Sequence, residues 1–316
     1  MKLVQHFDEF LKDEVNLNQS RIDKLESRVA SIKNFLRGNN YGANINGFSA
    51  QGSWAHKTII KPLDDSKEFD ADLVMFVQER EDWTPADYIN DLHRVFKSSG
   101  TYSKIVSRKT RCVTINYQGD FHIDIVPVIH KSSFLAGDEY FVCNREVNKT
   151  EVTDGDGFKN WWLAQDKEIG QHRLIKVARL LKYLRDYKQT FSAKSILLTT
   201  LIGRQVNLWE NLFSWNPYAD VPTTLKTVLV RLDEWCKGHP NLPKVENPVL
   251  PEEDFIRHWD QTKYDNFRSK IAQYREWVED AYNEEQRTES IRKWRRVFGE
   301  KFAGGEVTKS VNETIS

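Results

Sequence analysis

Two kinds of hydrophobic periodicity divide the chain. Apolar residues recur every three or four positions from Leu17 to Leu36, which predicts a long amphipathic helix. Shorter runs rich in branched and aromatic residues then predict strands over 45–49, 71–78, 112–117 and 121–128, with a helix over 85–99. Residues 147–156 are predicted as a loop. Helical periods return from residue 158 onward and include a predicted helix over 252–283. We therefore expect a mixed sheet lobe over 1–158, a helical lobe over 159–303 and a flexible polar tail over 304–316.

The composition excludes several classes of protein. The 316 residues are 39% hydrophobic and 29% charged, so the chain can bury a core. Its 46 basic and 46 acidic residues cancel, which disfavours binding to nucleic acid or an anionic membrane through the overall field. No window approaches the ~20 apolar residues of a membrane span, and the N-terminus is acidic rather than signal-like. We expect a cytoplasmic protein whose cysteines, Cys112, Cys143 and Cys236, are buried thiols.

The sharpest chemical feature is the pair Asp70 and Asp72 at the start of a predicted strand. Alternate side chains of a strand share a face, so these two carboxylates project together. On the predicted strand 121–128, the apolar residues alternate with His122 and Asp124. If the two strands are neighbours, Asp124 lies beside Asp70 and Asp72. Three carboxylates on a sheet suit two Mg²⁺ or Mn²⁺ ions, whereas an isolated Asp-x-Asp is better explained by aspartates that flank strand ends or pair with surface lysines.

A second signal lies upstream, in Gln51-Gly52-Ser53 after a predicted strand. Glycine lets a phosphate approach backbone N–H groups, and the serine hydroxyl adds a donor. Alone, such a Gly-Ser is a turn. Followed by Asp70 and Asp72 and the distal Asp124, it resembles the nucleotidyltransferase superfamily with the DNA polymerase β-like palm.

The longer block 51–62, with 68–72, is similar to the bacterial CD-NTases, the cyclic GMP-AMP synthase-like dinucleotide cyclases of antiphage (CBASS) signalling. Residues 247–249, 259–282 and 294–302 resemble this family as well. The resemblance implies an α+β fold, in which a palm (a mixed sheet with flanking helices) and a C-terminal helical lobe have the active site in the cleft between them. It implies an enzyme that joins NTPs (ATP, GTP or pyrimidine NTPs) into a cyclic di- or oligonucleotide second messenger and releases pyrophosphate.

The resemblance also assigns roles to particular residues. Asp70, Asp72 and Asp124 would be catalytic and hold the two metal ions, and Gln51, Gly52 and Ser53 would bind the nucleotide. In the family, a lysine on a helix and a serine about a dozen residues later hold the donor triphosphate. The matching positions are Lys182 and Ser195, with Lys176 and Ser192 as the alternatives. A solvated basic face on the predicted helix 171–187 would also explain this lysine.

The family implies partners: a downstream effector that binds the cyclic product, and regulatory proteins that bind or modify the synthase. Activation by nucleic acid is not expected, because no Cys/His cluster resembles the zinc insertion of the animal DNA sensor of this family. Two basic clusters are interpreted as solvated surface: Arg108, Lys109 and Arg111, for which a phosphate role is the alternative, and Arg292, Lys293, Arg295 and Arg296.

Two rival functions remain open. One is a linear oligonucleotide synthase, or another nucleotidyltransferase that acts on RNA or protein. The other is a non-catalytic binding module on a palm scaffold. The set of three aspartates argues against the module, because repelling carboxylates serve no purpose there.

Overall fold

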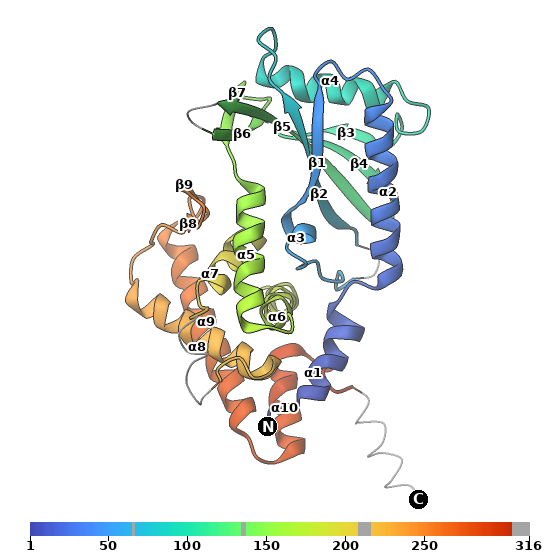
Figure 1. Ribbon diagram of the computed structural model, residues 1–316. Coiled ribbons are helices and arrows are strands. Elements are labelled where there is room, and N and C mark those ends of the chain that lie inside the picture. Colours follow the sequence, from blue (N-terminus) through green and yellow to red (C-terminus); the bar gives the residue numbers. More distant parts are fainter. Residues whose placement is uncertain (65–66, 134–136, 208–215, 305–316) are drawn as a thin grey trace, which may run out of the picture. The chain divides into compact units, whose positions relative to one another are not determined.

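A computed structural model describes residues 1–64, 67–133, 137–207 and 216–304 (Figure 1). The chain divides into two compact units. The sheet unit consists of Leu17–Lys57 and Asp64–Asn160, and the helical unit consists of Met1–Asn16, Thr58–Leu63 and the chain from Trp161 onward. Of the predicted tail, residues 305–316 lie outside the described residues.

A mixed seven-stranded sheet forms the sheet unit. Its strands are β1 (Ile45–Gln51), β2 (Phe69–Gln78), β3 (Val106–Arg108), β4 (Val113–Tyr117), β5 (Phe121–Ser133), β6 (Gly137–Asn144) and β7 (Lys149–Val152). Five of them follow the order β1-β2-β5-β4-β3, while β6 pairs with β5 and β7 pairs with β6. The pair β2–β5 is parallel, whereas β1–β2 and β4–β5 are antiparallel.

Two helices flank the sheet, α2 (Gln19–Arg37) and α4 (Pro85–Lys97) (Figure 1). They meet where Phe35 of α2 stacks on Phe96 of α4, with ring centroids 5.2 Å apart. The Arg21 guanidinium of α2 lies 5.0 Å from the ring centre of Phe69 on β2. The face of β2 that carries Phe69 is therefore the face covered by α2, and Asp70 and Asp72 lie on the other face.

The helical unit is built from packed helices and one hairpin. Its elements are α1 (Val4–Phe10), the π-helical turn η1 (Leu11–Val15), α6 (Arg173–Lys188), α7 (Ser195–Gly203), α8 (Val221–Gly238), the strands β8 (Glu246–Asn247) and β9 (Leu250–Asp254), α9 (Gln261–Asn283) and α10 (Arg287–Phe298). Helix α5 (Gly155–Ile169) begins in the sheet unit and continues into the helical unit.

The first 16 residues group with the helical unit, whereas the sequence pattern placed them in the sheet lobe. Two aromatic side chains of α1 explain the difference. The ring of Phe7 packs edge-on against Trp294 (4.8 Å between centroids), and that of Phe10 packs against Tyr183 (5.1 Å). Burying these rings ties the N-terminal segment to α6 and α10.

Two predictions of local structure were wrong. The segment 147–156, predicted as a loop, contains the edge strand β7. The predicted helix 252–283 begins only at Gln261, because Asp260 caps it by accepting a hydrogen bond from the Lys263 N–H (2.8 Å). The residues before it form the β8–β9 hairpin, in which Pro251 cannot supply the N–H that a helix interior requires.

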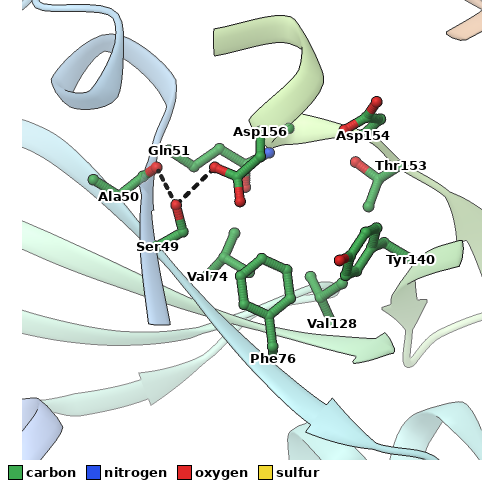
Figure 2. Close-up of a pocket in the computed structure, with 11 residues that line it drawn as sticks. Ser49, Ala50, Gln51, Val74, Phe76, Val128, Tyr140, Thr153, Asp154 and Asp156 are labelled. Carbon is green, nitrogen blue, oxygen red and sulfur yellow. Dashed lines mark hydrogen bonds between the residues drawn. The ribbon is translucent and has the colours of Figure 1, made fainter. Parts of the chain in front are cut away.

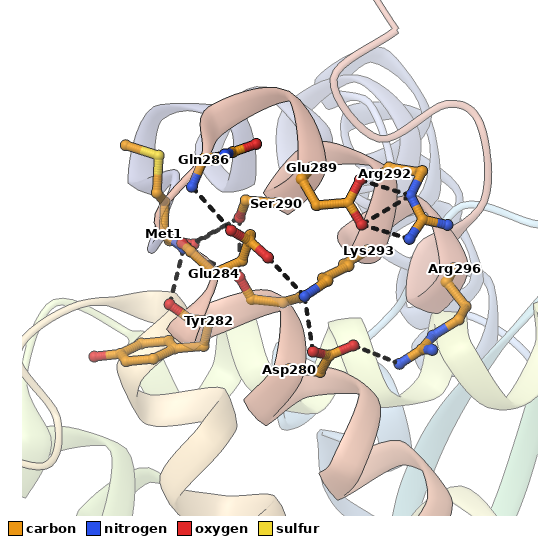
Figure 3. A network of polar contacts seen from close by, with 11 residues as sticks. Met1, Asp280, Tyr282, Glu284, Gln286, Glu289, Ser290, Arg292, Lys293 and Arg296 are labelled. Carbon is orange, nitrogen blue, oxygen red and sulfur yellow. Dashed lines mark hydrogen bonds and ion pairs between the residues drawn. The ribbon is translucent and has the colours of Figure 1, made fainter.

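Three basic residues of α10 are paired with carboxylates of α9, of α10 or of the turn between them (Figure 3). The Lys293 ammonium lies 2.9 Å from Asp280 and 2.7 Å from Glu284. The Arg296 guanidinium lies 3.2 Å from Asp280, and Arg292 pairs with a glutamate one turn earlier. This cluster is thus a mixed-charge network rather than a cationic surface.

Two expectations from composition can be compared with the described residues. Within them, no helix combines the length and the apolar character needed to cross a membrane. Cys112, Cys143 and Cys236 are buried free thiols, as predicted.

Candidate active site

A row of polar residues crosses four strands on the sheet face opposite α2. In the register of the sheet, Asp72 on β2 lies opposite Asp124 on β5 and opposite Gln51 on β1. Asp124 lies in turn opposite Thr114 on β4. Two residues earlier on the same two strands, Asp70 of β2 lies opposite His122 of β5. The structure therefore makes the two strands neighbours, the condition on which the prediction depended, and brings Asp124 beside Asp72.

The turn after β1 brings the backbone against this row. The short helix α3 (Gly52–Ala55) follows β1 directly, and Gly52 has φ +63°, a left-handed conformation that favours glycine. A Cβ at position 52 would lie 2.2 Å from Asp72 Oδ2. Glycine is thus required here twice, by its backbone angle and by the approach of the carboxylate. Ser53 follows within the same turn.

Two of the three aspartates have cationic or polar partners. Asp124 accepts hydrogen bonds from the Lys109 ammonium at 3.0 and 3.1 Å and from the Thr114 hydroxyl at 2.5 Å. Asp70 lies 2.8 Å from Nε2 of His122. Lys109 is partly solvated, as its sequence position suggested, but its ammonium also pairs with a predicted site residue.

Asp72 lies between these pairs. No hydrogen bond or ion pair to its carboxylate is found among the described residues. Burial, followed by the negative charges of Asp124 and Asp70, raises its pKa from 3.8 to about 6. The row therefore carries more negative charge than its neighbours balance.

The donor chemistry of the row fits Mg²⁺ or Mn²⁺, because carboxylate oxygens are the ligands these hard cations prefer. An excess of negative charge at Asp72 also favours a cation there. Within the described part of the chain, however, no three His, Cys, Asp or Glu side chains are already arranged to hold a metal ion. Both oxygens of Asp124 are bonded to Lys109, so its carboxylate would have to exchange partners to bind a metal.

Lys182 is buried in the helical unit, only 3% exposed, and does not lie on a solvated face of α6. Its ammonium donates to the carbonyl and to the hydroxyl of Thr58, both at 2.9 Å. Burial, followed by repulsion from Arg185, lowers its pKa to about 7. Arg185 also donates to the hydroxyl of Ser195 at 3.4 Å. The alternative lysine, Lys176, pairs instead with Asp8 at 3.3 Å.

The buried amine predicts a pH-dependent stability. The pKa of Lys182 is lower in the folded than in the unfolded chain, so between pH 7 and about 10 the unfolded chain binds more protons. The free energy of unfolding of the wild type should therefore rise with pH relative to Lys182→Met, by up to about 1 kcal/mol per pH unit. Denaturant unfolding at pH 7 and 9.5 measures this.

Lys176→Met is the matched control on the same helix, and its stability difference from wild type should not grow with pH. If the gap between wild type and Lys182→Met is the same at both pH values, the Lys182 amine stays fully charged in the folded protein.

A pocket lies further along the same sheet face (Figure 2). About 330 Å³ of space lies between its lining residues, and this figure includes open solvent. Apolar and aromatic side chains line one part, namely Val74, Phe76, Val128 and Tyr140, and polar ones line the other, namely Ser49, Gln51, Thr153, Asp154 and Asp156. The Ser49 hydroxyl donates to Asp156 at 2.9 Å, and the Gly157 N–H donates to Asp154 at 2.7 Å. These aspartates lie at the start of α5.

Comparison with known proteins decides the family. Residues 1–165 match the Second Messenger Oligonucleotide or Dinucleotide Synthetase (SMODS) domain. The chain belongs to the SMODS family. A curated relative of this SMODS protein, a c-di-GMP synthase from Roseivirga ehrenbergii, is 26% identical over 246 residues. That match covers 66% of this chain and 60% of the relative's own length.

Several solved structures share the fold of the SMODS protein. E. coli MS115-1 CdnC with ATP has a TM-score of 0.74 at 19% identity and covers 95% of this chain and 98% of its own. The same CdnC in complex with HORMA-deltaN has a TM-score of 0.72 at 17% identity, with the same coverage of both chains. The Bradyrhizobium diazoefficiens CD-NTase CdnG with GTP has a TM-score of 0.71 at 18% identity, and the match covers 100% of this chain and 98% of CdnG. Vibrio cholerae DncV cyclic AMP-GMP synthase with nonhydrolyzable GTP has a TM-score of 0.69 at 15% identity, and the match covers 94% of this chain and 96% of DncV. The predicted family and fold class, a nucleotidyltransferase palm with C-terminal helices, are confirmed.

The sequence analysis of this SMODS protein missed one residue that contacts the row and several that line the pocket. Asp154 lies in the connection between β7 and α5, as the predicted loop has it, whereas Asp156 lies in the first turn of α5. Neither is a predicted site residue, although Thr153-Asp154-Gly155 before a helical period is a plausible helix start. Tyr140 was missed with strand β6. The pairing of Lys109 with Asp124 had no sequence signal, because a long side chain in a turn follows no period.

Proposed function

We propose that this SMODS protein joins NTPs into a cyclic di- or oligonucleotide second messenger, with release of pyrophosphate, in bacterial antiphage defence. Family membership supports the reaction class. The observation that carries the proposal is the register of β2 and β5, which sets Asp72 opposite Asp124 with the backbone of Gly52 against the Asp72 carboxylate. Metal-ligating carboxylates beside a glycine turn are what transfer from a triphosphate requires.

In this proposal Asp70, Asp72 and Asp124 hold two Mg²⁺ or Mn²⁺ ions. When bound, the ions would neutralise part of the negative charge of the triphosphate. Gln51, the Gly52 and Ser53 backbone and the Ser53 hydroxyl bind the phosphates. Asp124 helps to accept the proton of a ribose hydroxyl, whose oxygen bonds to the α-phosphorus as the bond to pyrophosphate breaks. The roles of Lys182 and Ser195 in gripping the donor triphosphate stay predictions that the family resemblance supports.

We place a nucleobase in the pocket of Figure 2. Its aromatic and aliphatic side chains suit the faces of a base, and Asp154 and Asp156 supply carboxylate acceptors. Guanine offers a ring N–H and an amino group on one edge, which a carboxylate can accept together, whereas adenine offers an amino group without that ring N–H. We therefore expect GTP among the substrates, a substrate that the name of the c-di-GMP synthase and the GTP complex of CdnG support.

We further propose that the protein acts in the cytoplasm, that a downstream effector binds its product and that regulatory proteins bind the synthase. The complex of CdnC with HORMA-deltaN supports a regulatory partner of this kind.

Labelled NTPs test the function directly. Incubated with all four NTPs and Mg²⁺ or Mn²⁺, the protein should release a product that phosphatase does not degrade. The mass of this product should equal that of a whole number of nucleoside monophosphates less one water for each of them. EDTA should abolish its formation, because the site requires a divalent cation.

The rival functions give different results. A linear oligonucleotide synthase would yield products whose terminal phosphates phosphatase removes. A transferase acting on RNA or protein would release no labelled product until an acceptor is added. A binding module would consume no NTP. Each of these results would contradict the cyclase proposal.

A further inference from the structure

Lys109 binds a predicted metal ligand through both of that ligand's oxygens. Its ammonium lies 3.1 Å from Asp124 Oδ1 and 3.0 Å from Oδ2, and the Thr114 hydroxyl donates to Oδ1 at 2.5 Å. Both oxygens of Asp124 are therefore occupied by donors of this chain. A divalent cation cannot share a carboxylate edge with an ammonium at this distance, because the two positive charges would lie within a few ångströms of each other.

The turn that carries Lys109 is fixed by its backbone. The Lys109 N–H donates to the Cys112 carbonyl at 2.9 Å. Arg145 contacts the same turn, because its N–H donates to the Thr110 carbonyl at 2.9 Å and its Nε donates to the Lys109 carbonyl at 3.4 Å.

The Lys109 side chain, by contrast, is 49% exposed. Its flexible stem can swing the ammonium into water while the backbone of the turn stays in place. The contact with Asp124 can thus open without any rearrangement of the sheet.

We propose that Lys109 is an internal counter-ion that closes the metal-free site: its contact with Asp124 and the binding of a divalent cation by Asp124 are mutually exclusive. The ammonium offsets part of the repulsion among the three aspartates when no metal is present, and it must leave before a cation binds. The enzyme therefore binds a divalent cation more weakly than the three carboxylates would bind it without Lys109. This inference rests on the proposed role of Asp124 as a metal ligand.

The test is Mn²⁺ binding to the full chain without nucleotide, followed by the electron paramagnetic resonance signal of free Mn²⁺. Lys109→Met should bind Mn²⁺ about fivefold more tightly than wild type, because a competing ion pair that is partly exposed has been removed. Lys109→Arg, which keeps the charge, should bind no more tightly than wild type. If Lys109→Met does not fold, Lys109→Gln replaces it.

Arg111→Met is the matched control, since it removes one positive charge from the same turn but one that pairs with Glu151 rather than with an aspartate of the row. It should leave Mn²⁺ affinity close to wild type. A second readout is thermal unfolding, in which Lys109→Met should unfold at a lower temperature than wild type in EDTA and recover with Mn²⁺.

Two failures can be told apart. Equal Mn²⁺ affinity in wild type and Lys109→Met, with binding that Asp72→Asn abolishes, would overturn the counter-ion and leave the proposed function standing. Mn²⁺ binding that Asp72→Asn does not weaken, or no binding in any variant, would overturn both.

Discussion

Replacing Asp72 by asparagine is expected to lower synthesis of the cyclic product by roughly 10²–10³-fold or more, because it removes a central metal ligand. The same substitution should stabilise the metal-free fold. The pKa of Asp72 is raised to about 6 by burial and by its two neighbouring aspartates, so the ionised carboxylate is unfavourable in the folded chain.

The pH dependence of this effect has a definite sign. Between pH 4 and 6 the folded chain binds more protons than the unfolded one, because the folded pKa is the higher of the two. The free energy of unfolding of wild type should therefore fall through this window relative to Asp72→Asn, by about 1–3 kcal/mol in total. Denaturant unfolding in EDTA at pH 4.5 and 7 measures the gap.

Asp82→Asn is the control, since this aspartate pairs with Arg80 in the exposed turn after β2. This variant should synthesise the cyclic product at the wild-type rate. Synthesis at the wild-type rate by Asp72→Asn would show that the row of aspartates is not the catalytic site.

Replacing Gly52 by alanine should impair both activity and stability. The left-handed backbone at φ +63° costs a residue with a Cβ about 1–2 kcal/mol. The new methyl group would also lie 2.2 Å from Asp72 Oδ2, which forces the carboxylate out of its place opposite Asp124. A displacement of this size at a reacting centre lowers the rate roughly 10²-fold. Steady-state kinetics and thermal unfolding measure the two effects.

Gly47→Ala is a control on β1, the strand that leads into the Gly52 turn, because a Cβ at position 47 meets no atom within 4 Å. It should leave the rate and the unfolding temperature close to wild type. If Gly52→Ala retains the wild-type rate, the glycine turn does not bear on the position of Asp72 during catalysis.

The alternation of apolar and polar residues was sufficient to place the aspartates on one face. On β2 and β5 this period of two puts Asp72 and Asp124 on the face away from α2. That β2 and β5 are neighbours, and in which register, came from the sheet itself, since strand pairing depends on contacts between segments distant in sequence.

Other features had no periodic signal. Helix α6 is buried on almost every side, so its pattern could not distinguish a solvated Lys182 from the buried one that bonds to Thr58. The short edge strand β7 and the β8–β9 hairpin are stabilised by pairing rather than by local propensity. The pocket of Figure 2 is lined by residues of β1, β2, β5, β6 and the start of α5, so it depends on the pairing of these strands, which the sequence pattern did not reveal.

The central claim is that Asp72 and Asp124 together bind the catalytic metal beside the glycine turn. A crystal of the full chain with Mn²⁺ and a nonhydrolysable NTP, examined by the anomalous signal of manganese, tests it most directly. We expect an anomalous peak within coordination distance, about 2.0–2.4 Å, of oxygens of both carboxylates, with the Lys109 ammonium withdrawn from Asp124. A bound nucleotide whose manganese lies away from both carboxylates would contradict the account.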